Sequence, residues 1–155
     1  MFILSENTSV ENQIINLTSY MFHKHYCEND AEYIIEQMDN DIVWIGAAEH
    51  EFKTGLENVS SVFEEFKGKI PKCNISDEEY HVIKIAPKAY LCSGRMWIAT
   101  DESTKISLRA HQRVTMIFRE YDGYIKCCHI HISNPYCEMV DDDMRFSYKN
   151  VKAVI

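Results

Sequence analysis

The sequence predicts an α+β fold in which helices cover one face of a curved antiparallel sheet. Helical spacing of apolar residues is confined to the part of the chain before Pro71, and beyond it the pattern changes to alternation of apolar and polar residues. Helices gathered ahead of a run of strands are typical of α+β domains. The short turns between the predicted strands favour an antiparallel meander.

Three helices are expected in the first part of the chain. Residues 8–11 (TSVE) have the form of a capping box, and apolar residues from Val10 to Met21 recur at helical spacing. Residues 29–32 (NDAE) repeat the start signal, and residues 54–57 (TGLE) form another capping box. The predicted helices are roughly residues 8–27, a short segment that ends near Met38, and a third that ends at Gly68.

One strand is expected among the helices and four after them. Residues 41–46 (DIVWIG) form a β-branched and aromatic run between turn formers, and residues 47–53 form a polar loop. The later candidate strands are residues 74–85, 89–100, 105–120 and 124–133. Turns are predicted at residues 86–88, 100–104 and 121–123.

Length and composition favour a single domain over residues 1–155, with a core over about 8–135 and a C-terminal extension over 136–155. In the extension we expect an acidic turn at 141–143 and a short closing segment over 144–155. The net charge of −8 disfavours nucleic acid and anionic membranes as partners. Because there is no basic leader and no long apolar run, we expect a cytoplasmic protein whose six cysteines are reduced thiols.

The two faces of the predicted sheet differ in chemistry. In residues 106–119, one alternating set is apolar except for Gln112, and the other mixes Arg, His, Ser and Thr with Ile117. By alternation, the mixed face continues on neighbouring strands through Ser93, Arg95, Trp97, Ile125, Cys127, His129, His131 and Ser133. Two interpretations remain open. Either the apolar face packs on the helices and the mixed face is solvated, or the mixed face lines a pocket under the helices and the apolar face contacts another subunit.

The order of elements resembles the NTF2-like superfamily, in particular its SnoaL-like branch, in which three helices and a strongly curved sheet form a cone around a pocket. The local similarity is to the association (hub) domain of calcium/calmodulin-dependent protein kinase II. The last hairpin of that domain carries an Arg-Val pair, then Asp-Gly, then a Val-His-Phe-His strand. The matching segments here are Arg113-Val114, Asp122-Gly123 and His129-Ile130-His131-Ile132, and Arg95 falls where that domain has an inward arginine.

The resemblance implies the second arrangement of the faces, with a pocket on the concave side and a homodimer through the outer side. The implied ligand-binding residues are Arg95, Arg113, His111, His129, His131, Trp44 and Trp97. The implied dimer contact is Val114, Met116, Phe118, Ile130 and Ile132. Arg95 and Arg113 would then form a clamp for a carboxylate or phosphate, with Glu49 or Glu51 as counter-charge, so the expected ligand is a small organic anion.

No metal or cofactor site is predicted. His129 and His131 share a strand face, as metal ligands need, but no carboxylate follows at the spacing that a cupin-type site requires. Gly-rich phosphate loops, nucleophile elbows and His-Glu-x-x-His motifs are also missing from the sequence.

Acid–base catalysis is the alternative to simple binding. The candidate bases are the histidines His111, His129 and His81, which would serve an isomerase, dehydratase or hydrolase. Because no carboxylate falls on the presumed pocket face, we expect a ligand-binding domain rather than an enzyme.

Overall fold

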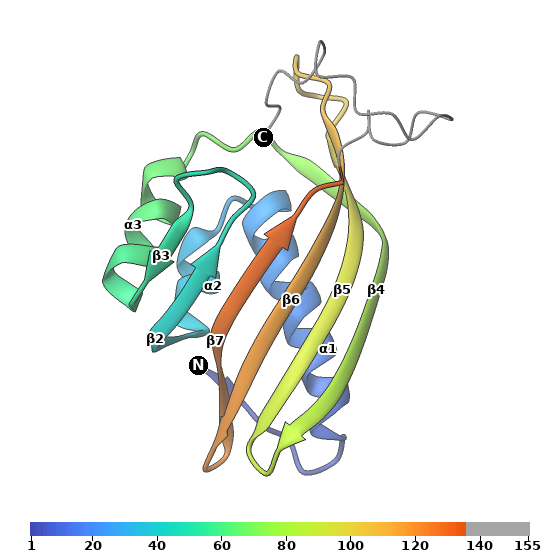
Figure 1. The fold of residues 1–155 in the computed structure, drawn as a ribbon. Coiled ribbons are helices and arrows are strands. Elements are labelled where there is room, and N and C mark those ends of the chain that lie inside the picture. The colour runs from blue at the N-terminus through green and yellow to red at the C-terminus, as the bar shows by residue number, and fades with distance from the viewer. Residues whose placement is uncertain (136–155) are drawn as a thin grey trace, which may run out of the picture.

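Helices pack on one face of a strongly curved sheet in the computed structural model, which describes residues 1–135 (Figure 1). The predicted α+β class, with helices ahead of most of the sheet, is confirmed. The predictions for residues 141–143, for the closing segment 144–155 and for Cys137 fall outside the described residues. Within residues 1–135, no helix has the length and apolar character needed to cross a membrane.

The helical layer forms where the sequence predicts it, but two of the predicted caps are wrong. The elements are α1 (Val10–Phe22), the π-helical turn η1 (His23–Cys27), α2 (Ala31–Glu36) and α3 (Leu56–Phe66). Ser9 caps α1 and Asp30 caps α2, each side chain accepting a backbone N–H three residues further on. Ser9 thus replaces the expected Thr8. The other expected cap, Thr54, belongs to a strand, and Gly55 precedes α3 with a φ of 83° that glycine adopts readily.

Seven strands form one mixed sheet. They are β1 (Phe2–Ile3), β2 (Met38–Ile45), β3 (Phe52–Thr54), β4 (Cys73–Ala86), β5 (Ala89–Thr100), β6 (Arg109–Tyr121) and β7 (Tyr124–Ser133). Their order is β3-β2-β7-β6-β5-β4, and β1 pairs with β7. The predicted meander is confirmed in β4 to β7, and β2 joins it by running parallel to β7. β1 and β3 are not predicted, because two or three residues are too short to show a period.

The apolar side of the meander faces the helices. Val114, Met116 and Phe118 of β6 are at most 3% exposed, and Ile130 and Ile132 of β7 are at most 4% exposed. All five belong to one core cluster together with apolar residues of α1, α2 and α3. The first interpretation of the faces is therefore the right one. The predicted dimer contact through these five residues is wrong, because they are buried inside a single chain.

A β-bulge in β7 breaks the alternation on which the predicted faces depend. Ile117 pairs with His129 but Phe118 pairs with Cys127, so Cys128 is an extra residue. Cys127 is consequently fully buried and belongs to the core cluster. Cys128 does not belong to that cluster, and its Sγ lies 3.5 Å from the carbonyl oxygen of Ile117. The prediction that Cys127 shares a face with the histidines is therefore wrong.

Candidate functional site

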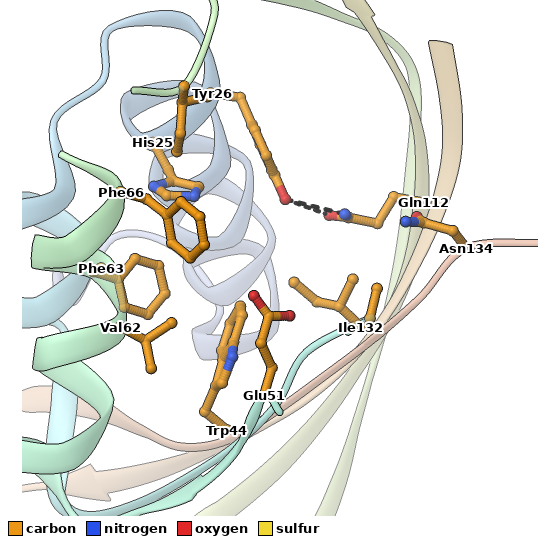
Figure 2. Close-up of a pocket in the computed structure, with 12 residues that line it drawn as sticks. His25, Tyr26, Trp44, Glu51, Val62, Phe63, Phe66, Gln112, Ile132 and Asn134 are labelled. Atoms are coloured by element: carbon orange, nitrogen blue, oxygen red, sulfur yellow. Dashed lines mark hydrogen bonds between the residues drawn. The ribbon is translucent and has the colours of Figure 1, made fainter. Parts of the chain in front are cut away.

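A cavity of about 230 Å³ opens between the helices and the concave face of the sheet. Its walls come from η1, α3, the β2–β3 loop and the inner faces of β2, β6 and β7 (Figure 2). The lining residues are His25, Tyr26, Trp44, Ala47, Glu51, Val62, Phe63, Phe66, Ile70, Gln112, Ile132 and Asn134. A mostly apolar and aromatic wall with a few polar groups is typical of a small-molecule site.

Tyr26 and Gln112 form a hydrogen-bonded pair on one side of the cavity. Nε2 and Oε1 of Gln112 lie 3.0 and 3.3 Å from the hydroxyl oxygen of Tyr26 (Figure 2). Burial raises the pKa of Tyr26 to about 12, because the phenolate would lose its hydration. The pair is therefore an uncharged hydrogen-bonding group at neutral pH.

His25 contributes an imidazole that is only 8% exposed. Its ring packs edge-on against Tyr26 and Phe63, with ring centroids 4.7 and 5.1 Å away. Burial among these rings lowers the pKa of His25 to about 4, since the charged form would lose its hydration. Nδ1 has no hydrogen-bond partner among the described residues. At neutral pH the site thus contains a neutral imidazole with an unused nitrogen.

Trp44 and Glu51 lie together on another side of the cavity (Figure 2). Trp44 is 6% exposed, packs edge-on against Phe63 with centroids 5.0 Å apart, and has no described partner for its Nε1–H group. The half-buried side chain of Glu51 points its carboxylate into the cavity, and one oxygen accepts a hydrogen bond from the amide of Ala48 at 3.2 Å. Glu51, one of the two loop carboxylates that the sequence suggested as counter-charges to the arginines, therefore lines the cavity.

Trp44 is the one predicted ligand-binding residue that lines this cavity. The other six, Arg95, Trp97, His111, Arg113, His129 and His131, lie on the outer face of β5, β6 and β7. They point outward because their neighbours Met96, Gln112 and Ile130 point toward the helices. The placement of these six residues in a pocket under the helices is therefore wrong, and any binding role of theirs stays a prediction.

The predicted arginine clamp forms only in part. Arg95 and Arg113 pair across β5 and β6 as expected. However, Nη2 of Arg95 lies 2.7 Å from Oε2 of Glu79 on β4, and His81 lies 2.8 Å from the other oxygen of that carboxylate. Glu79 thus already neutralises Arg95 on a solvent-facing surface.

The predicted catalytic histidines lie on the same outer face. Trp97 stacks on His111 with centroids 4.3 Å apart, and Cζ of Arg109 lies 4.1 Å from the centre of the Trp97 ring. Burial, with a smaller effect of the neighbouring His131 charge, lowers the pKa of the half-buried His129. None of His81, His111 and His129 lines the cavity, and among the described residues no three His, Cys, Asp or Glu side chains gather as a metal site would require.

A second hollow, of about 570 Å³, lies beside α2 and the start of β2. One of its two acidic residues, Asp39, accepts a hydrogen bond from the hydroxyl of Tyr121 and lies 3.3 Å from Nη1 of Arg119. The Lys126 ammonium group there donates to the carbonyl of Glu36. Because Asp39 and Lys126 already have partners within the chain, the first cavity is the stronger candidate site.

Three cavity residues, His25, Tyr26 and Gln112, were not predicted to line a pocket, and Glu51 was predicted only as one of two possible counter-charges to the arginine clamp. Gln112 had a usable signal, because it is the single polar residue in an otherwise apolar alternating set. His25 and Tyr26 had none, since a histidine and a tyrosine near the end of a helix are common. Glu49 and Glu51 were named together because both belong to the polar loop, and the structure places only Glu51, beside Gly46, in the cavity wall.

The curved sheet, the helices on its concave side and the cavity between them define an NTF2-like domain. Residues 15–137 match the SnoaL-like domain, and the chain belongs to that family. Among curated proteins no match was found. The superfamily predicted from the sequence is thus confirmed.

Solved structures show the same fold. An uncharacterized protein with a cystatin-like fold from Caulobacter vibrioides is 18% identical over 87% of this chain and 96% of its own, with a TM-score of 0.68. A ketosteroid isomerase-like protein from Erwinia carotovora atroseptica is 13% identical over 83% and 99%, with a TM-score of 0.66. A "putative calcium/calmodulin dependent protein kinase II association domain" from Xanthomonas campestris is 15% identical over 87% and 95%, with a TM-score of 0.65. At these identities the similarity shows the fold and not the activity.

Proposed function

We propose that this chain is a small-molecule-binding domain that takes its ligand in the cavity between η1, α3 and the concave face of the sheet. The supporting observation is the cavity itself, whose mainly apolar wall contains polar atoms of His25 and Trp44 that lack partners among the described residues. Protein interiors are normally close-packed and their buried polar groups are normally hydrogen-bonded. A bound ligand would fill the gap and supply contacts.

The charge of the cavity favours a ligand other than the organic anion expected from the sequence. Among its described lining residues none is arginine or lysine, and Glu51 adds a carboxylate. An anion placed there would be repelled and would gain no counter-charge. The proposed ligand is therefore uncharged or positively charged.

A variant whose cavity is filled by an added side chain, called the plugged variant, tests the proposal. Ala47→Phe adds a ring to the cavity wall, and Thr115→Phe adds the same ring to the outer sheet face. A panel of small aromatic and aliphatic compounds is screened by thermal shift on the wild type and on both variants. We expect some compounds to raise the melting temperature of the wild type and of Thr115→Phe but not of Ala47→Phe. If no compound stabilises the wild type, or if the plug changes nothing, the proposal is wrong.

Acid–base catalysis in the same cavity is the second candidate. It is supported by the neutral imidazole of His25 and the carboxylate of Glu51, two groups able to accept a proton in an apolar surrounding. The similar structure from Erwinia is named as ketosteroid isomerase-like. Such chemistry would remove a proton next to a carbonyl group.

Proton exchange tests this candidate directly. Small ketones are incubated with the protein in heavy water, and deuterium uptake next to the carbonyl is followed by NMR. We expect catalysed uptake in the wild type, and its loss in His25→Gln or Glu51→Gln but not in His81→Gln. Uptake at the buffer rate in the wild type would remove the enzymatic candidate and leave the binding function untouched.

Self-association and a cytoplasmic location complete the proposal. No described helix covers the outer face of β5 to β7, which leaves it free to meet a second copy (Figure 1). The similar structure from Xanthomonas campestris carries the name of an association domain. Free thiols at Cys27, Cys73, Cys92, Cys127 and Cys128 agree with a reducing compartment. Light scattering of the wild type and of Thr115→Glu tests the dimer, which is wrong if the wild type is monomeric at high concentration.

A further inference from the structure

Glu51 is the only acidic or basic residue among the described residues that line the cavity, apart from the neutral His25. Figure 2 shows its carboxylate pointing into the space between Trp44 and Ile132. The side chain is half-buried, so its charge is felt inside the cavity more strongly than a fully solvated charge would be. A negative charge in this position attracts cations and repels anions.

The β2–β3 loop holds Glu51 in this position. The Gly46 amide donates to the Glu51 carbonyl at 2.8 Å, and the Glu51 amide donates to the Ala48 carbonyl at 3.0 Å. The Ala48 amide in turn donates to the Glu51 carboxylate. A Cβ atom at Gly46 would lie 1.9 Å from Oε2 of Glu51, so only glycine leaves room for this side chain. The carboxylate is thus positioned before any ligand arrives.

No cation among residues 1–135, the part of the chain that the structure describes, neutralises the Glu51 carboxylate. No described lysine, arginine or histidine lies within ion-pair distance of this carboxylate, and the one hydrogen bond that it accepts from a described residue comes from the Ala48 amide. Glu79 on the outer face, by contrast, is paired with Arg95. A half-buried carboxylate without a counter-charge has lost part of its hydration and has received little in return. A positively charged ligand would supply the missing interaction.

Aromatic rings surround the same space. Trp44, Phe63, Phe66 and Tyr26 all line the cavity, and Trp44 and Phe63 meet edge-to-face at 5.0 Å with an interplanar angle of 68°. Aromatic faces attract organic cations through their quadrupole, and tryptophan does so best. His25 adds no positive charge that would oppose a cation, because burial keeps its imidazole neutral.

We propose, on the basis of the proposed binding function, that the cavity recognises a small organic ammonium ion. Its ammonium group pairs with Glu51, and its apolar body lies against Trp44 and Phe66. The cavity volume of about 230 Å³ limits the size of the ligand, because drug-sized ligands occupy pockets of about 300–1,000 Å³. The ligand class is therefore a compact amine with one ring or a short apolar chain.

Three similar compounds of different charge test the proposal: 2-phenylethylamine, 2-phenylethanol and phenylacetate. Binding is measured by the fluorescence of Trp44 in a Trp97→Phe background, where Trp44 is the sole tryptophan. We expect the amine to bind about tenfold tighter than the alcohol, in line with a hydrogen bond to a charged group. Phenylacetate should bind most weakly of the three, because the Glu51 carboxylate repels its negative charge.

Charge-neutral variants show which carboxylate is responsible. Glu51→Gln should bring the dissociation constant of 2-phenylethylamine close to that of 2-phenylethanol, whereas Glu49→Gln, on the exposed part of the same loop, should leave the difference unchanged. Since Glu51→Gln alters the loop, its folding is checked by circular dichroism. An independent measurement on the unaltered Glu51 protein is salt dependence: added salt should weaken binding of the amine and not of the alcohol.

The outcomes separate this proposal from the one on which it rests. If the alcohol binds as tightly as the amine, the ammonium selectivity is wrong while the binding function stands. If the amine is preferred equally in Glu51→Gln, another group selects it and the role of Glu51 is wrong. If none of the three compounds binds, the ammonium proposal is wrong, and the plugged-variant screen decides separately whether the cavity binds any small molecule.

Discussion

The inner and outer faces of β5, β6 and β7 are built from alternating residues of the same strands, yet they carry opposite chemistry. On the inner face, the buried residues are apolar except for Gln112. The outer face has Arg, His and Trp side chains held by partners of its own, such as Glu79 beside Arg95. The outer face resembles a binding site in composition, but the inner face has the cavity. Chemical variety alone therefore does not locate a site.

The largest expected difference between the faces is in stability. Phe118→Ala removes a fully buried ring from the inner face and should lower the free energy of unfolding by about 3–5 kcal/mol. Arg113→Thr on the outer face should change it by no more than about 0.5 kcal/mol. Urea denaturation of both variants measures the difference. Similar losses for the two would mean that the faces are not buried as described.

A smaller expected difference between the cavity and the outer face is in how their histidines make the free energy of unfolding depend on pH. The pKa of His25 is about 4 in the folded protein and near 6.5 when unfolded, so the unfolded chain binds more protons between these values. The stabilising effect of its neutral form is complete above pH 6.5 and is lost as the pH falls toward 4. From about pH 7 to about pH 5 the free energy of unfolding should fall by about 2 kcal/mol through this residue.

Urea titrations at both pH values check this expectation. His25→Phe, which keeps a ring and removes the titrating group, should lose most of the decrease. His81→Gln, on the exposed outer face, should retain it. An unchanged pH dependence in His25→Phe would show that His25 is not the group responsible.

The smallest expected effect lies on the outer face. Arg109 sits over the Trp97 ring, and a double-mutant cycle with Arg109→Ala and Trp97→Leu should give a coupling of about 0.5–1 kcal/mol. Raising the salt concentration should reduce it, since the charge is exposed. A coupling of several kcal/mol would imply that the outer face is buried, for example against a second copy.

The sequence was sufficient to predict the fold class and most elements, because periodicity over ten or more residues distinguishes a helix from a strand. It did not indicate which sheet face was inside, since both alternating sets run the full length of β6 and only tertiary packing chooses between them. The resemblance then favoured the wrong face. The bulge at Cys128 added a further error, because one extra residue reverses the alternation before it.

The site was harder to predict than the fold for a related reason. His25 and Tyr26 belong to a π-helical turn, Gln112 to a strand and Glu51 to a loop, so nothing in their spacing connects them. They meet only because the sheet curves around the helices. Trp44 was placed among the pocket candidates, although for the wrong arrangement of the sheet faces.

The position of Glu51 in the loop after β2 has a consequence for how such a protein could diversify. The carboxylate of Glu51 gives the cavity its charge, and Glu51 belongs to the loop of residues 46–51 that connects β2 to β3. It does not belong to a strand of the sheet. Loops of this kind tolerate exchange far better than the elements they connect. Replacing these six residues could convert a cavity for one charge into a cavity for another while the scaffold, and its stability, stay the same.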